Sequence, residues 1–200
     1  MKEKRVNSPK TSAKTALLLI DLVSDFSFED GDKLWKQTKK VIDPIAALTS
    51  KARSLNIPVV YVNDNFGKWS EDFQSQVKRI IDTSDRGREI VEPILPQESD
   101  LYVLKPQRSG FYETPLAVLL ESMGIRSLIL AGITTDICVL FTAHDAYMRG
   151  FSLVLPSDCT AAVKEGHRNQ ALELIERVAK ADIRPSNQLE DIWDRAKNKK

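Results

Sequence analysis

The chain has 200 residues, of which 42% are hydrophobic and 28% are charged, and its formal net charge is +1. This length fits one domain with a real core, and a nearly balanced charge carries neither a nucleic-acid nor a membrane-surface signature. No apolar run approaches the ~20 residues that a membrane span needs. Two cysteines are too few for a disulfide framework, which favours a reducing, cytoplasmic location.

Short apolar runs alternate with helical patterns along the chain. Five runs predict strands, of which 16–20 is continuous and apolar, as a strand covered on both faces should be, and a weaker sixth lies at 181–184. The five are 16–20, 58–62, 101–104, 127–131 and 152–155. Helical spacing of apolar residues predicts helices over 41–55, 73–80, 114–123, 138–149 and 164–180. This alternation predicts an α/β fold, with three α/β/α layers around a central, six-stranded, mainly parallel sheet.

Composition also predicts the domain limits. Residues 1–14 are polar and basic with no apolar core behind them, so we expect a flexible N-terminal tail rather than a signal peptide. One domain is expected over 15–186, followed by a polar C-terminal extension over 187–200. Between the second and third strands, 63–96 reads as a long loop region around one helix. Such insertions are often lids or binding loops.

Cys138 follows the fourth apolar run at the predicted start of a helix. A thiol in the first turn of a helix faces unpaired backbone N–H groups and the positive end of the helix dipole. This environment lowers the pKa of a cysteine and favours the nucleophilic thiolate. The alternative is a buried structural cysteine, which is common for free thiols.

Three chemically useful side chains follow three predicted strands. Asp21 ends the first strand, Lys105 ends the third, and Cys138 follows the fourth. Carboxyl ends of parallel strands share one edge of the sheet, where ligands bind in such folds. There the lysine would stabilise a thiolate, and the aspartate would exchange its proton. Each also has a simpler reading, since Asp21 could cap a turn and Lys105 could extend to solvent.

These segments resemble the isochorismatase-like cysteine hydrolases, the family that includes nicotinamidase and N-carbamoylsarcosine amidase. The likeness spans 15–186, and the motifs come in the same order on the expected elements. The matching segments are ALLLID at 16–21, KPQRSGF at 105–111, GITTDICV at 132–139, AYMRGF at 146–151 and SDCTAA at 157–162.

The resemblance implies a role for each matching residue. Cys138 resembles the nucleophile, Asp21 the general acid–base, and Lys105 the cation that holds both. It also implies a cis peptide bond between Ile133 and Thr134, and an oxyanion hole formed by the N–H groups of Thr134 and Cys138. The family's small substrate pocket is lined at the positions of Phe26 and Phe111. Members are usually homo-oligomers, so a dimer or tetramer is expected.

The chain also departs from the family pattern. Metal-binding nicotinamidases carry Asp-x-His after the second strand, where this chain has Asp64 followed two residues later by Phe66. We therefore expect no metal and no cofactor. Polar residues on the same loop, Asn63 and Asn65, together with Trp69, could bind a planar amide or ureido group; turn formation and packing are the alternatives.

The sequence therefore predicts a cysteine-dependent hydrolase of a small non-peptide amide or N-carbamoyl compound, acting through a thioester acyl-enzyme. The expected partner is a small-molecule substrate, with no nucleic acid and no membrane. Two alternatives remain: an enol-ether hydrolase of the isochorismatase kind that does not depend on the cysteine, and a non-catalytic binding protein on the same fold.

Overall fold

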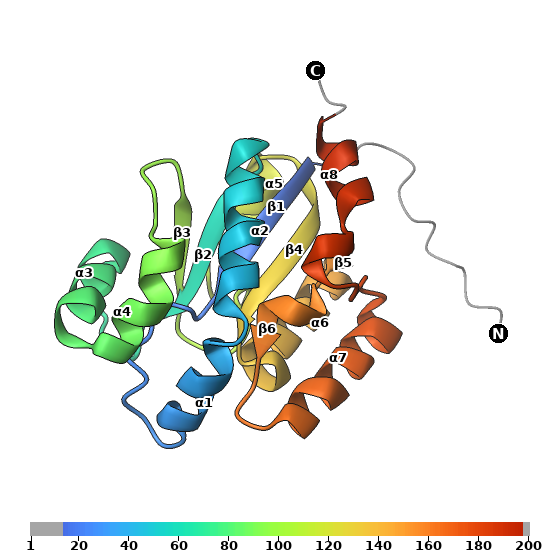
Figure 1. Cartoon of the computed structure of the whole chain (residues 1–200). Helices are drawn as coiled ribbons and strands as arrows, with labels where there is room; N and C mark the ends of the chain where they lie inside the picture. The colour runs from blue at the N-terminus through green and yellow to red at the C-terminus, as the bar shows by residue number, and fades with distance from the viewer. Residues whose placement is uncertain (1–13, 198–200) are drawn as a thin grey trace.

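The computed structural model describes residues 14–197, and Figure 1 shows one central sheet between helices. The tail predicted over 1–14 lies outside the described residues except for Lys14, which is the first residue of β1. Among the described residues, none of the helices combines the length and the apolar character that crossing a membrane requires.

The sheet has six strands, all paired in parallel, in the order β3-β2-β1-β4-β5 with β6 beside the end of β4. The six strands are β1 Lys14–Ile20, β2 Val59–Asp64, β3 Leu101–Lys105, β4 Ile125–Ile133, β5 Ser152–Val154 and β6 Thr160–Ala161. The predicted six-stranded parallel sheet is confirmed. The sixth strand was misplaced: 181–184 contributes only an isolated bridge from Asp182 to Val154, and the sixth strand is β6.

Helices cover both faces of the sheet (Figure 1). They are α1 Gly31–Thr38, α2 Ile42–Ser54, α3 Phe73–Thr83, α4 Asp85–Val91, α5 Leu116–Ser122, α6 Leu140–Met148, α7 Glu165–Ala179 and α8 Glu190–Lys197. Successive side chains of a strand point to opposite faces. Leu17 and Leu19 of β1 therefore join one hydrophobic cluster, while Leu18 and Ile20 join the other. A continuous apolar run is what a strand buried on both faces requires.

The segment between β2 and β3 is more ordered than predicted, because it carries α4 as well as α3. Helix α4 begins after Ser84, whose hydroxyl accepts the N–H of Gly87. A Cβ atom at Gly87 would lie 2.4 Å from Ile80 and 2.7 Å from the Ser24 carbonyl. This glycine therefore allows close helix packing at a site where a side chain would collide with its neighbours.

The C-terminal segment also belongs to the domain. The extension predicted over 187–200 contains α8 and the short helical turn Ser186–Gln188. Leu189 and Trp193 are buried in the same cluster as Leu17 and Leu19. Leu189, just before α8, and Trp193 within it are four residues apart, and together with the partly buried Ile192 they attach this mostly polar segment to the core.

Candidate active site

Asp21, Lys105 and Cys138 meet at the carboxyl edge of the sheet. Asp21 directly follows β1, Lys105 is the last residue of β3, and Cys138 lies in the turn that follows β4. The Nζ atom of Lys105 is 2.9 Å from Oδ2 of Asp21 and 3.5 Å from Sγ of Cys138. The structure thus brings together the three side chains that the sequence placed at this edge.

The ammonium group of Lys105 is completely buried and holds the cluster together. Besides Asp21 and Cys138, it contacts the carbonyl oxygen of Gln107 at 3.1 Å and Oδ2 of Asp64 at 3.5 Å. Burial alone would lower the pKa of Lys105, but Asp21, Cys138 and Asp64 together raise it. The lysine therefore stays charged and does not extend to solvent.

The carboxylate of Asp21 is fixed by hydrogen bonds and nearly buried. Its Oδ1 accepts the N–H of Asp64 at 2.7 Å, and its own N–H donates to the carbonyl of Val62. The backbone at Asp21 has a φ of 53°, which turns the chain sharply away from β1. Burial raises the pKa of Asp21, while Lys105 and Cys138 oppose the rise. A raised pKa suits a group that must both accept and return a proton.

Cys138 differs from expectation in two respects. It lies in a π-helical turn, Thr135–Val139, that precedes α6. Burial, followed by the negative charge of Asp21, raises the pKa of Cys138 to about 12, although Lys105 opposes the rise. The expected lowering of the Cys138 pKa is therefore wrong, since desolvation outweighs the nearby cation. The thiol is protonated at neutral pH, and Asp21 is the adjacent base.

The turn that carries Cys138 is anchored to neighbouring strands. The Thr135 hydroxyl pairs with the Thr160 hydroxyl at 2.8 Å, and Thr160 donates to the carbonyl of Gly132. The peptide bond between Ile133 and Thr134 is cis. Oγ1 of Thr134 is buried and has no hydrogen-bond partner among the residues that the structure describes. The Thr134 hydroxyl is thus a polar group available beside the nucleophile's turn.

Asp64 is the fourth member of the cluster and its third charged side chain, and it was not among the predicted site residues. It ends β2, opposite Lys105 in the register of the sheet, and its side chain is 35% exposed. Its Oδ1 accepts the N–H of Phe66. The rule that selected Asp21 and Lys105, a polar residue at a strand's carboxyl end, selects Asp64 once β2 is known to extend to that residue rather than to end at residue 62.

Two of the three predicted substrate contacts on this loop, Asn63 and Asn65, make structural hydrogen bonds. Asn63 is buried, and its amide accepts the N–H of Val23 at 3.0 Å and donates to the Val23 carbonyl at 2.9 Å. Those bonds join β2 to the turn after β1, so the amide that was expected to bind substrate is engaged within the fold. The Asn65 side chain accepts the N–H of Gly67 within a turn, and Trp69 is 80% exposed.

The two predicted pocket aromatics are packed in the core. Phe26 is 1% exposed and belongs to one hydrophobic cluster, beside Phe28. Phe111 is 3% exposed and belongs to the cluster on the other face, beside Phe151. Both rings support the segments around the site, Phe26 after Asp21 and Phe111 after Lys105.

The residues at the family's metal position do not fit zinc. Asp64 is followed by Phe66, which has no ligating atom, and one carboxylate is a poor metal site. Within the described part of the chain, no three His, Cys, Asp or Glu side chains are grouped to hold a metal ion. The ring of His144 contacts the Leu140 carbonyl, and that of His167 lies 3.5 Å from Asp136.

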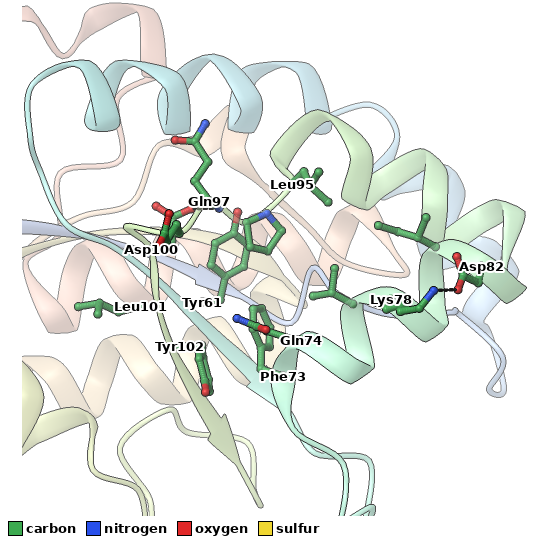
Figure 2. A pocket seen from close by; sticks show the side chains of 14 residues that line it. Tyr61, Phe73, Gln74, Lys78, Asp82, Leu95, Gln97, Asp100, Leu101 and Tyr102 are labelled. Carbon is green, nitrogen blue, oxygen red and sulfur yellow. Dashed lines mark hydrogen bonds and ion pairs between the residues drawn. The ribbon is translucent and has the colours of Figure 1, made fainter.

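A cavity of about 500 Å³ lies away from these residues, between α3, β3 and the segment before β3. Figure 2 shows Phe73 of α3 beside Tyr102, with Tyr61 above them in this view. The rings of Phe73 and Tyr102 stack with centroids 5.1 Å apart. None of Asp21, Lys105 and Cys138 lines this cavity.

Comparison with known proteins agrees with this fold. The isochorismatase domain model matches residues 15–182, so the chain belongs to the isochorismatase family and is a hydrolase of that family. The isochorismatase family protein YaaI of Bacillus subtilis is 37% identical over 179 residues, covering 90% of this chain and 98% of YaaI.

Two further relatives have names that specify a substrate. Ureidoacrylate amidohydrolase RutB of Methylorubrum extorquens is 26% identical, covering 73% of this chain and 69% of RutB. The structure of N-carbamoylsarcosine amidase from Thermoplasma acidophilum is 27% identical with a TM-score of 0.66, covering 88% of this chain and 99% of that chain.

Proposed function

We propose that this chain hydrolyses a small non-peptide amide or N-carbamoyl compound through a thioester at Cys138. One observation carries the proposal: the buried ammonium of Lys105 contacts both the Asp21 carboxylate, at 2.9 Å, and the Cys138 sulfur, at 3.5 Å. A base, a cation and a thiol held within contact distance are the parts that nucleophilic catalysis at an amide needs. The relatives named as an amidohydrolase and an amidase support an amide-type C–N bond as the bond that is cleaved.

The reaction begins with the protonated thiol. Asp21 accepts the proton of Cys138 as the sulfur attacks the carbonyl carbon, and Lys105 stabilises the developing thiolate. The N–H groups of Thr134 and Cys138 would hold the oxyanion of the tetrahedral intermediate. Asp21 then returns the proton to the leaving ammonia or amine. Water, deprotonated by Asp21, hydrolyses the thioester and restores the thiol. No metal takes part in this scheme.

The test is hydrolysis of a panel of primary amides, ureides and N-carbamoyl amino acids, measured as ammonia release. The wild type should hydrolyse at least one compound, and both Cys138→Ala and Asp21→Asn should lose that activity. Activity that survives Cys138→Ala but not Asp21→Asn would instead indicate the cysteine-independent, isochorismatase-type reaction. Zinc-dependent activity after chelation would contradict the metal-free scheme.

A further inference from the structure

The fixed charges around Cys138 do not balance. Two carboxylates, Asp21 and Asp64, face a single cation, Lys105. Over residues 14–194, no other lysine or arginine side chain lies within ion-pair distance of either carboxylate. With a protonated thiol, the cluster therefore carries one net negative charge.

Lys105 has no capacity left for an anionic ligand. An ammonium group has three N–H donors. Four acceptors already surround it: the carboxylates of Asp21 and Asp64, the Gln107 carbonyl, and the Cys138 sulfur. A carboxylate on a substrate would have to displace one of these contacts inside a buried site.

Asp64 is the most solvent-accessible charge of the cluster. Its side chain is 35% exposed, against 13% for Asp21 and 0% for Lys105. Its Oδ2 and the Cys138 sulfur are at most about 7 Å apart, since each lies 3.5 Å from Nζ of Lys105. A small molecule in reach of the sulfur is thus in reach of this carboxylate.

Asp64 is also held in place rather than free to move away. Its backbone N–H donates to Asp21, its carbonyl accepts from Gln76 at 2.9 Å, and its Oδ1 accepts the N–H of Phe66. The remaining oxygen, Oδ2, is the one that faces Lys105. The charge therefore keeps a fixed position beside the nucleophile.

We propose that Asp64 selects substrates by charge, favouring a neutral or cationic group and disfavouring a carboxylate next to the bond that Cys138 attacks. This inference rests on the proposed role of Cys138 and narrows its substrate class. A unit charge on the reacting molecule about 6 Å from the Asp64 carboxylate should change the rate of its reaction with Cys138. The expected change is about 3-fold at the dielectric constant of water and about 100-fold at the effective dielectric constant of a protein surface. The cationic guanidinium of Arg108 lies over the Phe141 ring rather than in the cluster.

The test uses three methanethiosulfonate reagents whose transferred group is neutral, cationic (trimethylammonioethyl) or anionic (sulfonatoethyl). The Cys138 sulfur attacks the sulfenyl sulfur of the reagent, a disulfide forms, and methanesulfinate leaves, while the thiol proton passes to Asp21 or water. The rate of labelling is measured as the increase in intact mass with time. The Cys138→Ala variant measures the labelling of Cys159, which is subtracted. No knowledge of the natural substrate is required.

Asp64→Asn should lower the ratio of the cationic to the anionic reagent's rate at least tenfold. The charge of Asp64 speeds the cationic reagent and slows the anionic reagent, so the two effects multiply in the ratio. Asp82→Asn, an equal change of charge at an exposed ion pair on α3, should leave the ratio unchanged. Asp64→Glu should retain it. An unchanged ratio in Asp64→Asn overturns the proposal.

A salt titration of the wild type supports the proposal independently of any variant's folding. The rate ratio should fall as ionic strength rises, since salt screens charges at an exposed site. The proposal is contradicted if the ratio of cationic to anionic rates equals that of a small free thiol and does not change with salt. Neither readout depends on hydrolysis, so a failed amide panel and a failed charge selection are distinguishable.

Discussion

The ammonium of Lys105 lies 2.9 Å from the carboxylate of Asp21, and the lysine side chain is completely shielded from solvent. The backbone of this residue ends β3, and the charged end of its side chain serves as the central contact of the site. The pair therefore has both a structural and a chemical role.

Removing the cation should destabilise the fold. Lys105→Met leaves Asp21 buried without its ion-pair partner, and breaking a buried pair typically costs about 3–5 kcal/mol. Asp21→Asn should cost less, because Lys105 keeps Asp64 as a partner. Urea unfolding of both variants measures the difference. A loss below about 1 kcal/mol for Lys105→Met would contradict the buried pair.

The acid limb of the pH–rate profile should report Asp21. Burial raises the pKa of Asp21 above 3.8, and the nearby charge of Asp64 adds to the rise. Because only ionised Asp21 accepts the thiol proton, activity should be lost as the pH falls through this raised pKa. Asp64→Asn should move that limb to lower pH, while Asp82→Asn should not. A shift to higher pH in Asp64→Asn would contradict this assignment.

Asp21→Asn should separate thiol reactivity from catalysis. Burial and the charge of Asp21 both raise the pKa of Cys138, so removing the charge lowers that pKa and increases the thiolate fraction. Alkylation by iodoacetamide at pH 8 should become faster, while hydrolysis falls by about 10²–10⁴, the usual loss with a general base. Slower alkylation together with retained hydrolysis would exclude Asp21 as the base.

Asn63 and Asn65 should behave differently despite their proximity in sequence. Asn63→Ala leaves the buried N–H and carbonyl of Val23 unsatisfied, at about 1–3 kcal/mol for each group. Asn65→Ala removes one exposed turn contact and should cost under about 1 kcal/mol. Thermal unfolding compares the two. Equal stability with a selective rise in KM for Asn63→Ala would restore its substrate-binding role.

The predicted features are those that depend on local pattern and on chain direction. Strands β1, β2 and β4 each contain a continuous apolar run, so the burial of those runs could be predicted from residue type alone. Asp21 follows β1 and Lys105 ends β3, and parallel pairing brings the carboxyl ends of these strands to one edge.

The features that were missed depend on tertiary packing. Strand β6 has two residues, too few for any periodicity, and forms because it lies beside the end of β4. Helix α8 is polar except for the side chains that reach the core. The shift in the pKa of Cys138 was predicted in the wrong direction. Whether this pKa rises or falls depends on how deeply the folded protein buries the sulfur, and the sequence pattern does not give that depth.

The most direct measurement is the intact mass of the protein quenched with acid during turnover of a substrate found in the panel. We predict a mass increase equal to the acyl group in the wild type, located at Cys138 by peptide mapping and missing from Cys138→Ala. Turnover of the same substrate with no acyl adduct at Cys138, and with full activity in Cys138→Ala, would contradict the thioester mechanism.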